Sequence, residues 1–522
     1  MLYIVLSVIS GLTLAISLPN YYIPFAFLVG YGLLFYLIEK NDTKRLILYS
    51  FIAGLVFSAI SFYWIIYAIH YYGKINLFLS SGLFLLFITA YSLYAFVLYS
   101  ILLKLFYKRY NYKGFFISPF LIVLLEVIRE YFPFTGFPWN LNGYMLSYIN
   151  QIAQISSLFS IYGISFLVLY FSVSFYMMFS NQHFRWIILN LLNMALFISI
   201  FLWGQSRIES YADKGESYKV SILQGNIDET LKIERNTEND MIVLNKYISL
   251  FEKAKKDNPD LIVLPESALP FFPFIDNDKK EYFFKEFEKI RIPFLSGFDN
   301  VILNKNLEIE KVYNSLFLVD ENGKYVDYYS KIKIVPFAEY SPIRFKFLEE
   351  IFEYMKGIDF SPGEGQKLLT FQENNKKPMK IVSLICFESI FPNYVSSFVN
   401  KGGNVIVNIT NDGWFGKTSA PYQHFEMARI RAIENNVYLI RAANTGISAV
   451  INPVGKIKSK LNLNTEGVLT DYVYLTDGRS FFNQNRIFIL IGYMVLFSLV
   501  LGRLEFYKAR SGRWEVNIFS LY

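Results

Sequence analysis

Long uncharged runs dominate the first 203 residues of this chain. Met1 to Ile38 holds no charged residue, and Pro19-Asn20 interrupts it. A helix that crosses a bilayer needs about 20 apolar residues, so this run predicts two spans joined by a tight turn. Six further runs predict single spans, for about eight in total, seven N-terminal and one C-terminal: Leu46 to Ile69, Leu77 to Leu103, Phe115 to Val127, Ile161 to Phe179, Trp186 to Trp203 and Ile487 to Leu501.

Two other interpretations of these runs are weaker. Buried core helices would need a very large surrounding domain, whereas the chain is 53% hydrophobic and only 18% charged, against about 25% charged in soluble domains. The first run could be a cleaved signal peptide, because Ala15-Ile16-Ser17 resembles a cleavage site. It lacks a basic leading segment, so we keep it as a span. Phe115 to Val127 is short and contains Glu126, so its boundary is the least defined.

The positive charges between the spans predict an orientation, because cytoplasmic loops retain Lys and Arg. Alternate loops on one side hold 12 such residues, and the short loops on the other side hold Lys74 and Arg129. Both termini are therefore expected in the cytoplasm, with residues 204–485 outside. The 12 are Lys40, Lys44, Arg45, Lys104, Lys108, Arg109, Lys113, Arg185, Arg503, Lys508, Arg510 and Arg513.

Charge and composition also exclude some partners. The net charge is +7, but residues 204–485 carry 35 Lys and Arg against 37 Asp and Glu. The positive charge thus belongs to the membrane loops, and we expect no nucleic-acid partner. One cysteine and three histidines (His70, His183 and His424) exclude an internal disulfide and a Cys-based zinc site. We expect no metal and no cofactor.

Residues 204–485 form a polar segment in which short β-rich runs alternate with helical patterns. This alternation predicts a layered α/β domain, inserted between membrane segments 1–203 and 486–522. The expected strands are Tyr218 to Gln224, Leu261 to Leu264, Ile292 to Ser296, Met379 to Ile385, Asn404 to Ile409 and Val437 to Ile451; the expected helices are Asp240 to Lys256, Lys279 to Lys289 and Tyr422 to Asn435.

Residues able to do chemistry follow the ends of these strands. Glu266 comes directly after Leu261-Ile-Val-Leu-Pro265, and Cys386-Phe-Glu388 comes after Ile381 to Ile385. Lys331 and Glu339 lie between them in the sequence. Active sites of α/β sheets form outside the carboxyl ends of strands. Alone, each has a plainer explanation: a buried small cysteine, a helix cap, a surface lysine.

A nucleophilic thiol needs a base and a group that stabilises the oxyanion. His424 is the one histidine of the polar segment and could serve as the base, although its place within a helical run favours packing. A carboxylate base with a lysine is the other solution. Glu266, Lys331 and Cys386 fit this second solution.

Six motifs in order resemble the nitrilase superfamily and, within it, the apolipoprotein N-acyltransferases. They are Thr135-Gly-Phe-Pro-Trp139-Asn140, Leu223-Gln-Gly-Asn226, Leu264-Pro-Glu266-Ser267, Lys331 with Ile334-Val-Pro-Phe-Ala-Glu339-Tyr340, Cys386-Phe-Glu388, and Asn411-Asp-Gly-Trp-Phe-Gly416. The resemblance implies an αββα sandwich. It also implies Glu266 as general base, Cys386 as nucleophile and Lys331 as the cation beside the oxyanion.

The same resemblance implies supporting roles, substrates and a location. Glu339 would support the lysine, and Glu388 would lie beside the nucleophile. The acyl donor would be a phospholipid, typically phosphatidylethanolamine, and the acceptor the α-amino group of a diacylglyceryl-cysteine in an apolipoprotein. The enzyme would lie in the bacterial inner membrane with its catalytic domain on the periplasmic side. A thioester intermediate would divide the transfer into two easier steps.

Two positions depart from the family pattern. Phe387 stands where some members have tyrosine, and Ile233 where some have tryptophan. Trp414 and Trp139 are candidates for lining the acyl or headgroup site, with core packing as the alternative for Trp414. Phe347 to Met355 has an apolar helical face that suits an interfacial lid or, equally, a core helix.

Three functions therefore remain open from sequence. The first is the lipoprotein N-acyltransferase. The second is a membrane-tethered carbon-nitrogen hydrolase acting on a small amide or nitrile, which the same three residues would permit. The third is a catalytically silent membrane scaffold. The apolar spans favour the first, because a soluble substrate gives no reason for them.

Overall fold

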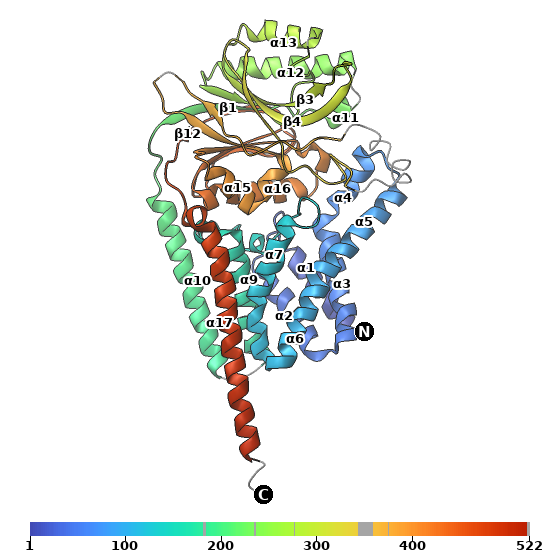
Figure 1. The fold of residues 1–522 in the computed structure, drawn as a ribbon, viewed down its shortest axis with the longest axis vertical. Coiled ribbons are helices and arrows are strands. Elements are labelled where there is room, and N and C mark those ends of the chain that lie inside the picture. The colour runs from blue at the N-terminus through green and yellow to red at the C-terminus, as the bar shows by residue number, and fades with distance from the viewer. Residues whose placement is uncertain (181–183, 234–235, 276, 343–358, 374, 519–522) are drawn as a thin grey trace.

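The molecule has two parts stacked along its long axis, a bundle of apolar helices and a domain built on β-sheets (Figure 1). The computed structural model describes residues 1–180, 184–233, 236–275, 277–342, 359–373 and 375–518. The main helices of the bundle are α1 (Leu2–Ala15), α2 (Ala26–Lys40), α3 (Thr43–Phe62), α4 (Trp64–Tyr67), α5 (Leu77–Ser92), α6 (Tyr99–Tyr110), α7 (Ser118–Tyr131), α9 (Ser156–Ser180), α10 (Phe184–Ser210) and α17 (Phe481–Ile518).

Every apolar run that was expected to span a membrane lies largely in the helices of this bundle. Among the described residues, five helical stretches are long and apolar enough to cross a membrane: Thr43–Phe62, Leu77–Tyr131, Ser156–Ser180, Trp186–Ser210 and Phe481–Ala509. Leu2–Ala15 is apolar but shorter. Leu77–Tyr131 contains two of the expected spans, which the 3-10 segment Asn111–Ile117 separates. The bundle is compatible with a membrane domain, and the count of eight spans stays a prediction.

The surface of the bundle is apolar where a soluble protein would be polar. Large apolar side chains along α10 and α17 are exposed, and such continuous patches mark a surface that another phase covers. A lipid environment suits these two helices. The exposed residues include Ile187, Leu191, Leu192, Met194, Ile198 and Leu202 on α10, and Ile487, Phe488, Ile491, Met494, Val495 and Leu499 on α17.

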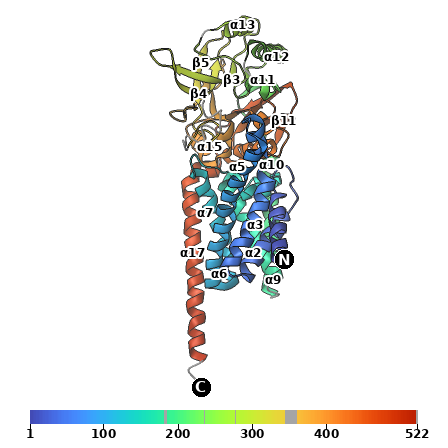
Figure 2. The ribbon, with the colours of Figure 1, turned by 90° about the vertical axis from the view of Figure 1, so that its right-hand side faces the viewer.

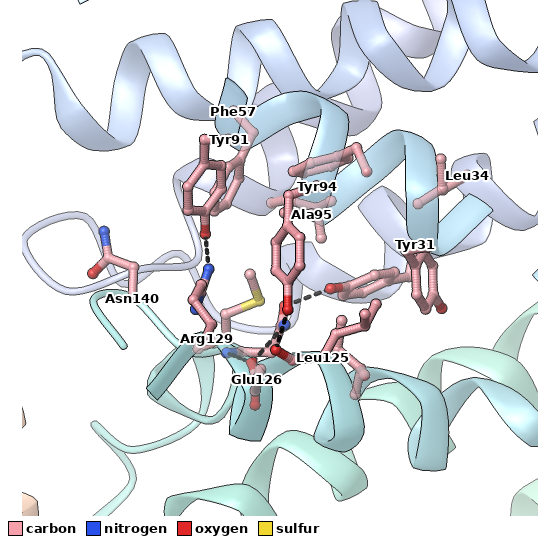
Figure 3. A pocket seen from close by; sticks show the side chains of 16 residues that line it. Tyr31, Leu34, Phe57, Tyr91, Tyr94, Ala95, Leu125, Glu126, Arg129 and Asn140 are labelled. Atoms are coloured by element: carbon pink, nitrogen blue, oxygen red, sulfur yellow. Dashed lines mark hydrogen bonds between the residues drawn. The ribbon is translucent and has the colours of Figure 1, made fainter. Parts of the chain in front are cut away.

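A polar cluster lies inside the bundle, where Glu126 and Arg129 of α7 line a small cavity (Figure 3). Glu126 Oε1 accepts hydrogen bonds from the backbone N–H of Asn142 at 2.6 Å and from its side-chain amide at 2.8 Å. Arg129 donates to the hydroxyl of Tyr91. Buried polar groups need such partners, so this cluster ties the loop after α7 to the surrounding helices.

The polar domain contains two six-stranded sheets in the described part of the chain. Each has three parallel strands at its centre and antiparallel strands outside them. The first runs β12 (Gly467–Tyr474), β1 (Ser217–Gln224), β2 (Leu261–Val263), β3 (Phe294–Leu303), β4 (Ile309–Val319), β5 (Tyr325–Ser330). The second runs β11 (Ile457–Leu461), β10 (Ser448–Ile451), β9 (Tyr438–Ala443), β8 (Val405–Thr410), β7 (Met379–Ile385), β6 (Leu369–Phe371).

Helices cover both outer faces of the paired sheets, which confirms the expected αββα sandwich. Helices α12 (Thr237–Lys255) and α13 (Asp278–Phe287) lie on the first sheet, far from the bundle (Figures 1 and 2). Helices α15 (Pro392–Val399) and α16 (Ala420–Asn435) lie between the second sheet and the bundle. Aliphatic side chains form the core of this domain, among them Val220, Ile222, Leu384 and Val407.

Helix α16 is buried along nearly its whole length because both parts of the molecule pack on it. Ala428 and Ala432 join the apolar core of the sheet domain, whereas Ile430 and Ile433 join the apolar core of the bundle. The helix also carries charges, and each is paired on the same helix. Arg429 lies 2.7 Å from Glu426, and Arg431 lies 2.9 Å from Glu434.

Each part of the molecule supplies a carboxylate to a helix of the other. Glu130 of α7 accepts the backbone N–H of Asn393, in the first turn of α15, at 2.8 Å. Glu434 of α16 accepts the N–H of Ile161 at 2.8 Å and the hydroxyl of Ser160 at 2.7 Å, where α9 is kinked. The first N–H groups of a helix lack partners within it and attract negative charge. These exchanged contacts fix the domain on the bundle.

Removing one of these carboxylates should loosen the junction. We expect Glu434→Ala to destabilise the protein by about 3–5 kcal/mol, because it leaves Arg431 as an unpaired buried charge and frees the N–H of Ile161. Thermal unfolding of the full chain in detergent measures the effect. The control is Asp477→Ala, which removes an ion pair on the surface: the side chain of Lys377 is 66% exposed and that of Asp477 is 78% exposed. This variant should change the melting temperature little. Equal shifts for both variants would contradict the proposed junction.

Candidate active site

Glu266 lies just past the C-terminal end of β2, in a turn packed against the neighbouring strand. Its side chain is buried. Oε1 accepts a hydrogen bond from Asn314 Nδ2 at 2.6 Å, and Oε2 accepts the backbone N–H of Asn411 at 2.9 Å. Gly297 of β3 permits this approach, since a Cβ there would come within 2.6 Å of Glu266 Cα. Both carboxylate oxygens are therefore held in place.

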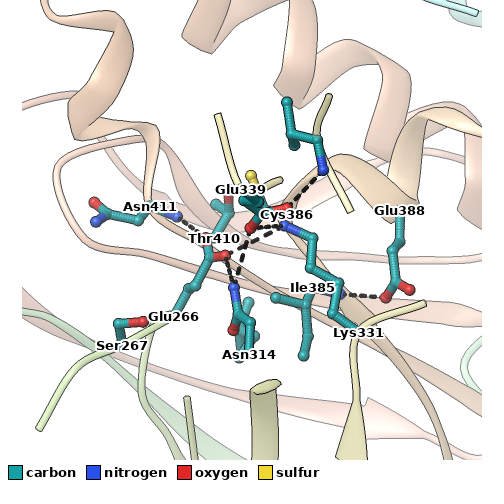
Figure 4. A network of polar contacts seen from close by, with 12 residues as sticks. Glu266, Ser267, Asn314, Lys331, Glu339, Ile385, Cys386, Glu388, Thr410 and Asn411 are labelled. Carbon is teal, nitrogen blue, oxygen red and sulfur yellow. Dashed lines mark hydrogen bonds and ion pairs between the residues drawn. The ribbon is translucent and has the colours of Figure 1, made fainter. Parts of the chain in front are cut away.

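Lys331 directly follows β5 and is buried between two carboxylates. Its Nζ lies 2.6 Å from Glu339 Oε1 and 3.6 Å from Glu266 Oε1 (Figure 4). Glu339 is held in turn by the N–H of Val335 at 2.7 Å. Although burial disfavours the ammonium form, Glu339 and Glu266 outweigh it and raise the pKa of Lys331. The lysine is therefore a permanent cation.

Cys386 is the first residue after β7 and begins a short 3-10 segment. Its φ is +49°, a left-handed conformation that is uncommon outside glycine. The chain therefore turns sharply at the thiol, which lies in one cluster with Glu266, Lys331 and Glu339 (Figure 4). Burial and then the charge of Glu266 raise the pKa of Cys386, and Lys331 opposes them in part. The resting group is a thiol that needs a base.

Glu388 is buried and connects the lysine segment to the nucleophile strand. Its Oε1 accepts the N–H of Ile332 at 2.8 Å and the hydroxyl of Tyr329 at 2.7 Å. Its Oε2 accepts the N–H of Ile385 at 2.9 Å. These bonds use both oxygens, so the side chain anchors two backbone segments. The sequence places Glu388 two residues after Cys386 but gives no sign of this anchoring function.

The aromatic candidates lie at the junction between the domain and the bundle. Phe387 is buried and stacks on Phe137 with ring centres 6.3 Å apart. Trp139 is also buried, and its indole N–H donates to Gln423 at 2.8 Å. Trp414 is 42% exposed, so of the two tryptophans it has more surface available to a substrate.

Ile233 is the last residue of α11 (Glu229–Ile233). The segment from Phe347 to Met355 lies outside the described residues.

Several site residues were missed in the sequence. Asn314 is a single asparagine within β4, which no pattern distinguishes from other strand residues. Asn411 opened one of the motifs but contributes through its backbone N–H, a group that every residue except proline carries. His424, weighed as a base, has both ring nitrogens engaged elsewhere: Nδ1 lies 2.9 Å from Asp412 Oδ1 and Nε2 lies 3.1 Å from the Cys386 carbonyl oxygen.

The cluster has the parts that acyl transfer requires. Glu266 is a fixed carboxylate, Cys386 a thiol at a chain turn, and Lys331 a cation within the same group. Such sets form and resolve thioesters. The arrangement suits a carboxylate base better than an imidazole base.

Family models match most of the chain. Residues 219–481 match the carbon-nitrogen hydrolase model, and residues 10–174 match the apolipoprotein N-acyltransferase N-terminal domain. Among solved structures, Saccharomyces cerevisiae Nit3, a member of branch 10 of the nitrilase superfamily, is 20% identical with a TM-score of 0.37, over 51% of this chain and 93% of that one.

Named relatives match this chain over most of its length. The apolipoprotein N-acyltransferase of Geobacter metallireducens is 33% identical over 490 residues, covering 92% of this chain and 91% of that protein. The enzyme of that name in Rickettsia typhi is 33% identical over 471 residues, 88% of each chain. That of Aquifex aeolicus is 31% identical over 439 residues, 84% of this chain and 91% of the relative. The chain belongs to the apolipoprotein N-acyltransferase family.

Proposed function

We propose that this protein transfers a fatty acyl chain from a membrane phospholipid to the N-terminal α-amino group of S-diacylglyceryl-cysteine in apolipoproteins. The single observation that carries this proposal is that Glu266 and Lys331 of the first sheet meet Cys386 of the bundle-facing sheet in one cluster (Figure 4). The segment after Lys331 also touches the bundle, since Thr135 donates to the carbonyl oxygen of Ile334 at 3.2 Å. Donor and acceptor are both anchored by acyl chains in a bilayer. A site next to apolar helices meets such substrates without extracting them.

The first step forms a thioester on Cys386. Glu266 takes the thiol proton, and the sulfur attacks the carbonyl carbon of a phospholipid ester. Lys331 stabilises the negative oxygen of the tetrahedral intermediate. The carbon–oxygen bond to glycerol then breaks, and the lysophospholipid oxygen leaves with the proton that Glu266 held.

The second step transfers the acyl group to nitrogen. The acceptor amine attacks the thioester carbonyl, and Glu266 takes a proton from the attacking nitrogen. When the carbon–sulfur bond breaks, the amide product leaves and the sulfur regains that proton. Thioesters react with amines far more readily than oxygen esters do, which is the chemical reason for the covalent intermediate.

Supporting residues and location complete the proposal. Glu339 keeps Lys331 charged, and Glu388 holds the lysine segment against the nucleophile strand. The donor is phosphatidylethanolamine, and the protein is a multi-pass component of the bacterial inner membrane. Segments 1–203 and 486–522 are the membrane parts, residues 204–485 form the periplasmic catalytic domain, and both termini are cytoplasmic.

A membrane-tethered carbon-nitrogen hydrolase is the second candidate. The match of residues 219–481 to the carbon-nitrogen hydrolase model favours it, and the same thiol chemistry would cleave a small amide. A hydrolase that acts on a small soluble amide, however, would have no use for the apolar helices. Acylation by phospholipid is therefore the measurement that separates the two candidates.

Mixing the purified protein with phosphatidylethanolamine should add one acyl chain to Cys386. Because Cys386 is the only cysteine, intact-protein mass spectrometry and removal by hydroxylamine identify the thioester. Cys386→Ser should show no hydroxylamine-labile adduct. An unmodified wild-type protein that hydrolyses small amides would replace the transferase by the hydrolase.

Acylation should also depend on pH through Glu266. Burial, together with the negative charge of Glu339, raises the pKa of this carboxyl above its ordinary value of 4.5, although Lys331 and the hydrogen bonds from Asn314 and Asn411 lower it. A base works only when deprotonated, so the rate of thioester formation should be full above this raised pKa and fall as the pH drops through it. Glu266→Gln should abolish this fall in rate at low pH and slow acylation by about 10²–10⁴-fold. The rate is measured by quenched mass spectrometry, and a rate that stays level on acidification of folded protein would contradict the role of Glu266.

Reporter fusions test the orientation. A periplasm-active reporter fused at Lys305, in the exposed loop between β3 and β4, should be active, and a cytoplasm-active reporter there silent. A fusion near Lys108, in the basic last turn of α6, serves as the matched control and should behave oppositely. A cytoplasmic signal at Lys305 would reverse the proposed topology.

A further inference from the structure

A buried histidine lies behind the nucleophile. His424 is in α16, and its side chain is fully buried together with those of Asp412 and Arg441. Asp412 follows β8, and Arg441 lies on β9. The proposed reaction uses none of these three side chains. Fully buried charged groups are kept only where they are paired and hydrogen-bonded.

The histidine ring connects Asp412 to the backbone of the nucleophile. Nδ1 lies 2.9 Å from Asp412 Oδ1 and 3.2 Å from Arg441 Nη2, so it has a partner in either protonation state. Nε2 lies 3.1 Å from the carbonyl oxygen of Cys386 and 3.1 Å from Ser389 Oγ. A carbonyl oxygen only accepts, so Nε2 carries a proton in the bond to Cys386.

The Cys386 carbonyl is where the nucleophile needs support. With φ at +49°, Cys386 occupies a backbone conformation that persists only where surrounding contacts impose it. Its carbonyl leaves the ladder of β7 and meets His424 Nε2 and the hydroxyl of Ser389, the latter at 3.0 Å. These two donors hold the peptide in the turned conformation.

Asp412 lies on the opposite side of the His424 ring from Cys386 and next in sequence to the residue that holds Glu266. Its Oδ2 lies 2.9 Å from Arg441 Nη2, and its Oδ1 accepts the hydroxyl of Thr410 at 3.1 Å. Although burial disfavours ionisation, Arg441 and His424 lower the pKa of Asp412 to about 2. The preceding residue, Asn411, holds Glu266 through its N–H. Asn411 therefore holds Glu266 directly. The next residue, Asp412, acts on the backbone of Cys386 through the ring of His424.

We infer that His424, held by Asp412, is a positioning residue that fixes the backbone turn of Cys386 and so aims the thiol at Glu266 and Lys331. This inference rests on the proposed function of Cys386 as nucleophile. His424 touches no reacting atom and exchanges no proton with substrate. Its contribution is the relative placement of two groups that lie on different strands and belong to different sheets.

Two amide variants distinguish the contribution of Nε2 from that of Nδ1. In His424→Gln the side-chain amide nitrogen reaches the place of Nε2 and can still donate to the Cys386 carbonyl. In His424→Asn the amide reaches only the place of Nδ1, so the contact to Asp412 can persist while that to Cys386 is lost. We expect thioester formation from phosphatidylethanolamine to slow about tenfold in His424→Asn, as loss of one hydrogen bond implies. His424→Gln should stay within about threefold of wild type on the same scale.

Three readouts on the full chain decide the inference. They are single-turnover thioester formation, alkylation of Cys386 by iodoacetamide, and the melting temperature. A slow Asn variant beside a near-normal Gln variant, at similar melting temperatures, supports the positioning function. Equal rates in both variants, whether normal or impaired, overturn it. If wild-type Cys386 forms no thioester, the transferase proposal fails, while the alkylation rates of the two variants still decide the positioning of the thiol.

A second substitution covers the case in which neither His424 variant folds. Asp412→Asn removes the negative charge that pairs with Arg441 and orients the ring from its Nδ1 side. We expect slower thioester formation at unchanged KM for phospholipid, because the substrate contacts are untouched. An unchanged rate in folded Asp412→Asn would overturn the inference.

Discussion

The placement of the catalytic domain depends on hydrogen bonds exchanged across its boundary with the helical bundle. Glu130 holds the start of α15, and Glu434 holds the kinked start of α9. The Cys386 turn leads through a 3-10 segment directly into α15. The distance between the Cys386 thiol and the bundle therefore depends on how α15 and α16 pack against the bundle. For an enzyme whose substrates cannot leave the bilayer, this distance decides whether an ester group can reach the sulfur.

Burial is also what makes the charges of the site effective. Lys331 is surrounded by Glu339 and Glu266, and Asp412 by Arg441 and His424. Away from water, such pairs are costly to break and act strongly on their neighbours. The same surroundings raise the pKa of the Cys386 thiol, so the resting thiol keeps its proton, which in the proposed reaction passes to Glu266. The resting site is thereby protected from side reactions of a free thiolate.

Some elements could be read from the sequence with little ambiguity, and others could not. Apolar runs of this length identify the helices of the bundle because an α-helix pairs its backbone groups within a single segment, as lipid requires. The buried strands before Glu266 and Cys386 were found because they are continuous aliphatic runs. Strand β4 was not expected, since its first half is exposed and carries Glu310 and Lys311 among its apolar residues. Val437 to Ile451, expected as one strand, forms β9 and β10 because the chain turns back between them.

The sequence by itself determined the apolar helices, the two-part organisation and the choice of Glu266, Lys331 and Cys386 as the proposed reacting side chains, because hydropathy, periodicity and motif order are local properties of the chain. Only the tertiary structure decided how those side chains are held. Asn314, Asn411, Glu388 and His424 act through backbone groups or through partners far away in sequence, and such contacts leave no periodic or compositional pattern. His424 illustrates the difference: its residue type suggested a base, whereas its neighbours in space make it a support for the nucleophile.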